Sequence, residues 1–454
     1  MIGTKLFPAL ISTNSAVTVI ERLVLRNVRL TDIKDCPLDI EFCPSMSSPA
    51  TPRSHAPQTH IHTHIPPDAT FEYPLHFFPS QKPESIGETF NGCMETSSDP
   101  GTNGPDGVRN ICIASAFGCL GWTIFWYHTQ FLPHISQFPE PVAKHMRKAI
   151  HFTTISLEPK KAVHYYREAL READELGMDP FSDAIIGIKI QLAYLFEKSH
   201  LYQKSIDVLE IVKADNLKWI EILGDKEGNE AKKTRVLMSA VRVSIKLADL
   251  YANQYVMDKA KAEECLMWGV ETSLMEEQRR IKEGVKPSEG EWFSSEEIGA
   301  EIEELAHHFE EKNAHYLAAP LFLQAIARSP PNTCHTVILM NNLAISLAQQ
   351  VPPSRPGQPP ASRATYISNA RSWTNQAISI ADKIPKSYRT GECDVGCAVA
   401  THNLGEFAEM DGNVAGARKF FEQANAISKA IGFQEGVDNS IAGLARLAEE
   451  KKKD

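Results

Sequence analysis

Apolar residues recur at three- and four-residue intervals through the C-terminal part of the chain, from about Pro139 to Lys453. Glycine and proline fall mostly between these stretches, and the alternation of apolar and polar residues that is typical of strands is missing. This spacing places apolar side chains along one face of a helix. Residues 139–453 are therefore predicted to be almost wholly helical.

The helical stretches repeat one pattern of small and large apolar residues. In "NLGEFAEMDGNVAGARKFFEQA", residues 403–424, a Leu-Gly step is followed by regularly placed alanines and an aromatic residue. The copies are Leu404, Gly405, Ala408, Ala417, Phe421, Ala424; Leu305, Ala306, Phe309, Ala318, Phe322, Ala325; Leu247, Ala248, Tyr251, Ala260, Met267; Leu192, Ala193, Phe196, Ser205, Leu209, Val212; Leu343, Ala344, Leu347, Ala370, Ala377; and Ala162, Tyr166, Ala169. Small residues let two antiparallel helices approach closely, and this is the pattern of tetratricopeptide (TPR) units. The chain is predicted to be all-α, with a TPR-like α-solenoid of helical hairpins.

One uncharged run precedes this repeat region. "ICIASAFGCLGWTIFWYHTQFL", Ile111 to Leu132, contains no Asp, Glu, Lys or Arg. An α-helix needs about 20 predominantly apolar residues to cross the bilayer core, and Trp122, Trp126 and Tyr127 stand where interfacial aromatics belong. One transmembrane helix is predicted at residues 111–132, and a helix buried in a protein core is the alternative.

Residues 1–110 are rich in Pro, Ser, Thr and His and contain too little periodic apolar sequence to form a core. They are predicted to be disordered. Within them, Met1 to Leu30 carries a single acid, Glu21, and its basic residues are Lys5, Arg22, Arg26 and Arg29. A basic, amphipathic, acid-poor N-terminus is typical of a mitochondrial targeting segment. An ordinary basic surface helix is an equally weighted alternative.

Charge and cysteine content narrow the possible partners. The chain has 47 basic and 57 acidic residues and a formal net charge of -10, so binding to nucleic acid is not expected. An acidic surface suits basic or amphipathic polypeptides better. The nine cysteines are scattered, and Cys393 and Cys397 are spaced C-x3-C, unlike zinc or thioredoxin-type sites. The cysteines are predicted to be free, mostly buried thiols without a disulfide framework.

The usual catalytic and phosphate-binding motifs are missing from the sequence. The histidines His60, His62 and His64 stand in the region predicted to be disordered and have no fixed partners for metal binding. His307 could form an acid/base pair with Glu304 or Glu311, one helical turn away, but a solvated charged helix face is predicted instead. The same kind of solvent-exposed charged face is predicted for the neighbouring residues Glu303, Glu310, Glu296, Glu297, Glu301 and His308. We therefore predict a non-enzymatic protein without cofactor or metal.

A binding groove is predicted on the first helices of the hairpins, because such arrays curve and expose an extended surface. Asn342 and Asn403 both stand immediately before a Leu-Ala or Leu-Gly step. An amide side chain has both a donor and an acceptor, which match a peptide group. The predicted groove residues are Asn342 and Asn403, with Asn341, Lys246 and Gln349 as weaker candidates. A structural asparagine that bonds the neighbouring helix remains the alternative.

A basic N-terminus, one span and a C-terminal TPR array together resemble the fungal TPR adaptor of the mitochondrial inner-membrane i-AAA protease. The stretches "SLEPKKAVHYYREALREADELGMDPFSDAIIGIKIQLAYLFEK" and "MNNLAISLAQQ" carry the resemblance, which covers roughly Gly107 to the C-terminus. It implies an array in the intermembrane space that presents unfolded or membrane-anchored clients to the protease. A TPR assembly factor for a respiratory-chain complex, a soluble TPR co-chaperone and a helical enzyme using His307 and Glu311 are the alternatives.

Overall fold

The computed structural model describes residues 137–350 and 362–450, and the regular structure within these ranges is helical. The helical prediction for residues 139–453 is therefore confirmed where the chain is described. The region 1–110 and the predicted span 111–132 lie outside the described residues. Within the described ranges, no helix has both the length and the apolar character that crossing a membrane requires.

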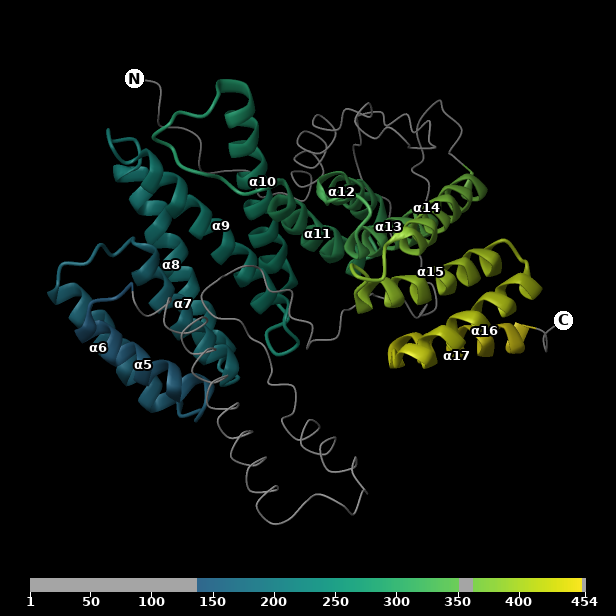
Figure 1. Cartoon of the computed structure of the whole chain (residues 1–454), viewed down its shortest axis with the longest axis horizontal. Coiled ribbons are helices and arrows are strands. Elements are labelled where there is room, and N and C mark those ends of the chain that lie inside the picture. The colour runs from purple at the N-terminus through teal and green to yellow at the C-terminus, as the bar shows by residue number, and fades with distance from the viewer. Residues whose placement is uncertain (1–136, 351–361, 451–454) are drawn as a thin grey trace, which may run out of the picture. The chain divides into compact units, whose positions relative to one another are not determined.

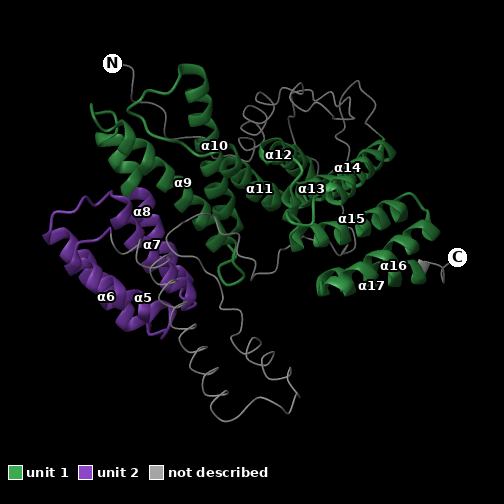
Figure 2. Cartoon of the chain, viewed as in Figure 1, with its two compact units in different colours: residues 1–64, 215–454 green, residues 65–214 purple. Residues whose placement is uncertain are grey.

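The helices follow one another in chain order as a series of hairpins (Figure 1). They are α5 (Glu140–Thr154), α6 (Pro159–Glu175), α7 (Asp183–Lys198), α8 (Tyr202–Leu223), α9 (Glu230–Ala252), α10 (Lys259–Glu283), α11 (Ser295–Glu311), α12 (His315–Arg328), α13 (Cys334–Gln349), α14 (Arg363–Lys383), α15 (Gly391–Met410), α16 (Val414–Ile431) and α17 (Gln434–Glu450). The chain divides into two compact units, residues 65–214 and residues 1–64 with 215–454 (Figure 2), and the boundary falls within α8.

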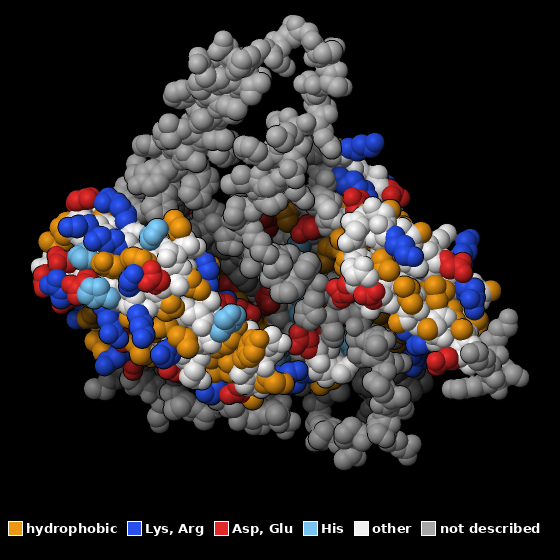
Figure 3. Space-filling view, turned by 90° about the horizontal axis from the view of Figure 1, so that it is seen from below, with side chains coloured by type: hydrophobic (Ala, Val, Ile, Leu, Met, Phe, Trp, Pro, Cys, Tyr) orange, Lys and Arg blue, Asp and Glu red, His pale blue; other side chains and the backbone are white. Residues whose placement is uncertain are grey.

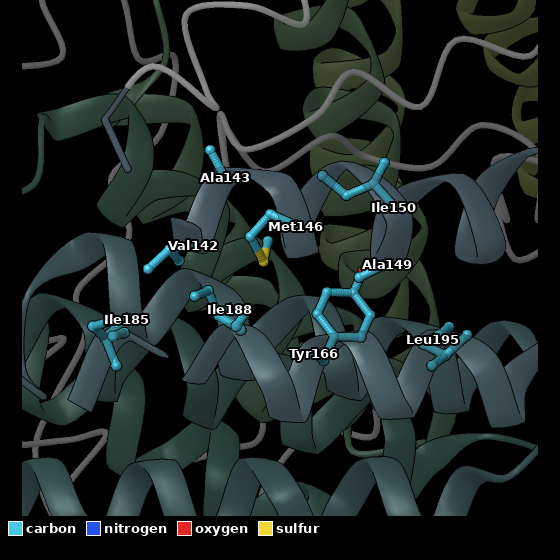
Figure 4. Packing of buried hydrophobic residues seen from close by; sticks show 12 residues of the cluster. Val142, Ala143, Met146, Ala149, Ile150, Tyr166, Ile185, Ile188 and Leu195 are labelled. Atoms are coloured by element: carbon cyan, nitrogen blue, oxygen red, sulfur yellow. The ribbon is translucent and has the colours of Figure 1, made fainter. Parts of the chain in front are cut away.

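The unit of residues 65–214 is built around the hairpin of α5 and α6 and the following helix α7. Its core contains apolar side chains from all three helices (Figure 4): Val142, Ala143, Met146, Ala149, Ile150, Ala162, Tyr166, Ala169, Ala173, Ile185, Ile188 and Leu195. The fully buried Tyr166 has its hydroxyl 3.1 Å from Thr153 Oγ1, which satisfies its polar end. Burial raises the pKa of Tyr166 to about 12. The prediction that Ala162, Tyr166 and Ala169 lie on a packed second helix is confirmed.

In the other unit, four hairpins follow in series: α9 with α10, α11 with α12, α13 with α14, and α15 with α16. The helix α17 packs on α16 and α15. The small residues of the repeat lie where paired helices touch, as Ala306, Ala318, Ala417 and Ala424 are all fully buried. This arrangement confirms helical hairpins of the TPR type.

Gly405 shows why the small positions are needed. A Cβ atom added to Gly405 in α15 would lie 2.7 Å from the ring carbons of Phe421 in α16. This is closer than van der Waals contact, so the backbone of α15 packs directly against the aromatic ring. Gly443 in α17 approaches the same ring, with a Cβ distance of 2.9 Å.

One position of the repeat was assigned to the wrong residue. Ala260 was predicted to be the buried small residue of α10, but it is exposed, and Ala262 is fully buried in its place. In other copies the two small residues are twelve positions apart, as in Ala306 and Ala318. The turn between α9 and α10 has six residues, 253–258, against three between α11 and α12, and the contact moves from Ala260 to Ala262.

The cysteine prediction is also wrong in one respect. Cys334 and Cys393 form a disulfide with an S–S distance of 2.09 Å, whereas Cys265 and Cys397 are free. The bond joins the first residue of α13 to the beginning of α15, across 59 positions of sequence. The cysteine nearest to Cys393 in the sequence is Cys397, which is not its partner. Only the packing of α13 beside α15 brings the two sulfur atoms together.

Candidate functional site

Each of the first helices α9, α11, α13 and α15 contains one leucine of the repeat pattern: Leu247, Leu305, Leu343 and Leu404. The residue immediately before this leucine occupies the same position in all four helices. These residues are Lys246, Glu304, Asn342 and Asn403, which we call the polar row. Equivalent positions of equivalent helices present their side chains on equivalent faces. The row therefore runs across four consecutive hairpins, and three of its members are residues that the sequence predicted for a binding groove.

The two asparagines of the row are buried. Asn342 and Asn403 are each 3% exposed. The side-chain nitrogen Nδ2 of Asn342 lies 3.5 Å from Nε2 of His307 on α11. Asn403 makes no side-chain hydrogen bond to any residue in the described ranges. The amide atoms of Asn403 are not fully enclosed, so its donor and acceptor remain available to solvent or to a ligand.

Lys246 and Glu304 complete the row. Lys246 Nζ lies 2.6 Å from Asp249 Oδ2, one turn further along α9. Glu304 is half-buried and makes no hydrogen bond within the described part of the chain. Burial, together with the charges of Glu303, Asp249 and Glu311, raises the pKa of Glu304 to about 7. At neutral pH this carboxyl group is about half protonated.

Asn341 has a different place from its neighbour Asn342. It is fully buried, and its Nδ2 donates a hydrogen bond of 2.9 Å to the backbone carbonyl of Gly396 on α15. This is the structural alternative that the sequence left open, since the amide joins α13 to the next first helix. The role of Asn342, Asn403, Asn341 and Lys246 in peptide binding stays a prediction.

The contact of Asn341 recurs at the same register in two other first helices. Glu303 on α11 contacts His335 on α13 at 3.0 Å, and His402 on α15 has its Nδ1 3.4 Å from Ser440 Oγ on α17. In all three cases the residue two positions before the Leu reaches the next first helix. These polar contacts hold consecutive first helices, and hence the polar row, in register.

An ion cluster surrounds His307 between α11 and α13. His307 Nδ1 lies 3.2 Å from Glu310 Oε2, and its Nε2 lies 3.7 Å from Glu303 Oε1. Although burial opposes the charge on His307, the two carboxylates raise its pKa to about 10. Burial likewise disfavours charge on Glu303, but His307 and His335 lower the pKa of Glu303 to about 2. The cluster is therefore ionised at neutral pH.

This cluster corrects the prediction of a solvated charged face. Glu303, Glu310, His308 and Glu301 are all buried, whereas Glu296 and Glu311 are exposed as predicted. Residues Glu296 and Glu297 do begin a helix, because Ser294 and Glu297 form a reciprocal capping box at the start of α11. Sequence periodicity on α11 alone does not reveal that α13 contacts Glu303 and Glu310, or that α10 contacts His308.

The cluster does not assemble an acid/base pair. His307 contacts Glu303 and Glu310, not Glu304 or Glu311 as the sequence allowed. An imidazolium held between two carboxylates has no free lone pair to accept a proton near neutral pH. Within residues 137–350 and 362–450, no three His, Cys, Asp or Glu side chains are arranged to hold a metal ion. The histidines at 60, 62 and 64 lie outside these ranges.

Comparison with known proteins supports the helical-repeat assignment. No protein-family model matches the chain. A TPR repeat-containing protein of Schizosaccharomyces pombe is 25% identical over 333 residues, which are 71% of this chain and 82% of that protein. A protein of Saccharomyces cerevisiae, Protein MRG3-like, is 37% identical over 84 residues, 18% of this chain and 16% of that protein. The crystal structure of BtubC from P. vanneervenii matches with a TM-score of 0.41 and 15% identity, covering 64% of this chain and 91% of that one. The fold of the described residues is a TPR-like array of helical hairpins.

Proposed function

We propose that the polar row binds an extended segment of another polypeptide and that the chain is a non-enzymatic adaptor. The amide of Asn403, which no described residue pairs, is the observation that carries the proposal. It occupies the register of Asn342, is 3% exposed and makes no hydrogen bond within the described ranges. An amide can donate to a carbonyl and accept from an N–H of one peptide group, without reading its side chain. Such a row suits clients of diverse sequence.

The contacts of the residues that directly precede members of the row support this proposal. Glu303, Asn341 and His402 each link one first helix to the next, so these contacts fix the positions of the row residues relative to one another. A rigid site loses less conformational freedom on binding, which favours affinity for a flexible peptide. Because the bracing residues and the row residues alternate along the helices, the two roles can be separated by mutation.

The experiment is capture of client proteins by the full chain carrying Asn342→Ala with Asn403→Ala. We expect capture to fall while the free energy of unfolding stays close to that of the wild type. The matched control is Asn375→Ala, an exposed asparagine on the second helix α14. Equal capture by the double variant and the control would refute the proposal, and so would loss of capture in proportion to loss of stability.

The specific role we propose is presentation of unfolded or membrane-anchored clients to the i-AAA protease of the mitochondrial inner membrane. The resemblance of "MNNLAISLAQQ" and of the α6–α7 region to that adaptor family supports it. A tag on the C-terminus should be cleaved by added protease only after the outer mitochondrial membrane is ruptured, and a hexameric AAA protease should co-purify. Protection of the tag after rupture would favour a respiratory-complex assembly factor in the matrix. A tag found outside mitochondria would favour a soluble co-chaperone.

A further inference from the structure

The part of the polar row formed by α11 and α13 is rich in hydrogen-bond acceptors. Glu304 makes no hydrogen bond to a described residue, and the buried Oε1 of Gln349 on α13 has no partner there either. Glu311 follows seven residues after Glu304 on α11, just as Gln349 follows seven residues after Asn342 on α13. Seven residues are two helical turns, so each pair lies on one helix face.

These acceptors lie beside one another across α11 and α13. Ser346 Oγ on α13 lies 3.4 Å from Glu310 Oε1 on α11. Glu311 directly follows Glu310, and Gln349 is one turn beyond Ser346. The contact between Glu310 and Ser346 therefore brings the carboxylate of Glu311 and the amide oxygen of Gln349 to the same level of the two helices.

The positive side chains nearby are held by other carboxylates. Lys246 contacts Asp249 at 2.6 Å, His307 lies between Glu303 and Glu310, and Lys312 pairs with Glu263. The charged groups that act on Glu304 are Glu303, His307 and Glu311 from its own helix and Asp249 from α9. Three of these four groups are acids, so a further cation beside Glu304 would be stabilised by Coulomb attraction.

We propose that the part of the row formed by α11 and α13 binds a Lys or Arg side chain of the bound polypeptide, and that the carboxylate of Glu304 pairs with its positive charge. An ammonium or guanidinium group has several donors and no acceptor, which matches a site of acceptors. The proposal rests on the proposed function, because the amides of Asn342 and Asn403 hold the backbone of the same polypeptide. Asn403, which makes no hydrogen bond in the described chain, is the member of the row on which that function rests.

On the face drawn in Figure 3, basic and acidic side chains are interspersed over the described surface rather than separated into fields of one sign. A general attraction of basic peptides to the net charge of -10 would be screened by salt within about 10 Å at 0.1 M. A partly buried carboxylate is screened much less. The preference for a basic side chain is therefore expected to persist in salt.

Binding of a cation also favours the ionised form of Glu304. Because burial and its acidic neighbours place the pKa of Glu304 at about 7, part of the population carries a proton near neutral pH. The proton must leave when the cation binds. Affinity for a basic peptide should therefore rise between pH 6 and pH 8, with release of protons.

The test uses the full chain and three fluorescein-labelled unstructured peptides that differ only in carrying Lys, Gln or Glu at one central position. The wild type should bind the Lys peptide about fivefold more tightly than the Gln peptide, and the Glu peptide most weakly. Glu304→Gln should abolish the preference and its rise with pH, so that this variant binds the Lys peptide and the Gln peptide with equal affinity. Glu264→Gln, an exposed carboxylate on α10, is the matched control.

The outcomes separate this inference from the proposed function. If Glu304→Gln keeps the wild-type preference for the Lys peptide, the inference is wrong even though the row binds peptides. If the wild type binds all three peptides equally, the inference is also wrong. If Asn342→Ala with Asn403→Ala leaves binding of every peptide unchanged, or if the wild type binds none of them, the proposed function fails and the inference fails with it.

Discussion

His335 Nε2 on α13 lies 3.0 Å from Glu303 Oε2 on α11, so two consecutive first helices are joined by a buried acid and a histidine. The same carboxylate faces His307 on its other side, at 3.7 Å. Glu303 therefore contacts two imidazole groups, and they lower its pKa to about 2 despite its burial. Its position two residues before Leu305 is the one from which Asn341 and His402 also contact the next first helix.

Replacing Glu303 by Gln should destabilise the protein. The substitution keeps the size of the side chain but removes the buried negative charge of Glu303, which leaves the half-buried His307 without one of its two carboxylates. Breaking one partner of a buried ion pair typically costs about 3–5 kcal/mol. Urea unfolding at pH 7 measures the effect, and Glu264→Gln should change the free energy of unfolding by less than about 0.5 kcal/mol. Equal stability of the two variants would contradict the bracing role of Glu303.

Stability should fall as pH rises from 5.5 to 8. Glu301 is 3% exposed, and burial raises its pKa from 4.5 to about 8. Above pH 4.5 the unfolded chain loses this proton while the folded chain keeps it, so the stabilisation is lost as pH rises through 8. The loss over this window is roughly 2–3 kcal/mol. His307, with its pKa raised from 6.5 to about 10, adds a loss of the same sign above pH 6.5.

Glu301→Gln separates the two contributions. The variant should be more stable than the wild type at pH 8 and should show a shallower decrease of stability with pH. The slope left above pH 6.5 belongs to His307 together with Glu304 and His335, whose pKa values are also raised. Denaturant titrations at several pH values measure both quantities, and an unchanged slope in Glu301→Gln would show that this carboxyl group is not the buried acid responsible.

Gly405→Ala should destabilise the α15–α16 hairpin. The added Cβ would meet the ring of Phe421 at 2.7 Å, and overpacking of this kind costs about 1–3 kcal/mol. Alanine is about 1 kcal/mol better than glycine inside a helix, which offsets part of the cost. Gly391→Ala in the same helix is the control, because its Cβ would meet nothing within 4 Å. Thermal unfolding should therefore shift down for Gly405→Ala and not for Gly391→Ala.

Removing the disulfide should reduce stability by about 4 kcal/mol. The bond between Cys334 and Cys393 closes a loop across 59 positions, and the loss of chain entropy in the unfolded state gives this magnitude. The variant is Cys334→Ala with Cys393→Ala, and Cys397→Ala serves as the control. Peptide mapping of the alkylated protein, with and without reductant, should show Cys334 joined to Cys393 in the wild type. Alkylation of Cys334 and Cys393 before reduction would contradict the bond.

The sequence predicted the hairpins well because close helix contact requires small residues, and these recur visibly at Ala306, Ala318 and Gly405. It placed one contact at Ala260 instead of Ala262, because the length of the preceding turn is not apparent from periodicity. The buried ions and the disulfide could not be predicted. Glu303 and His335 are 32 positions apart, and only the packing of α13 on α11 shows that they are partners.

The candidate site was found by its register, since Asn342 and Asn403 stand at the same place in two copies. The same comparison, shifted by one residue, would have found the bracing positions Glu303, Asn341 and His402. These positions carry a carboxylate, an amide and an imidazole, so their common role is not apparent from residue type. It becomes apparent when the first helices are aligned on the leucine of the repeat.

The most direct measurement compares Asn403→Ala with Asn341→Ala in binding a permanently unfolded, carboxymethylated protein by fluorescence anisotropy, alongside urea unfolding. Asn403 loses no hydrogen bond on truncation, so we expect unchanged stability and about fivefold to tenfold weaker binding. Asn341 loses its bond to Gly396, so we expect a loss of about 1–2 kcal/mol in stability. Wild-type affinity in Asn403→Ala would contradict a polypeptide-binding role of the polar row.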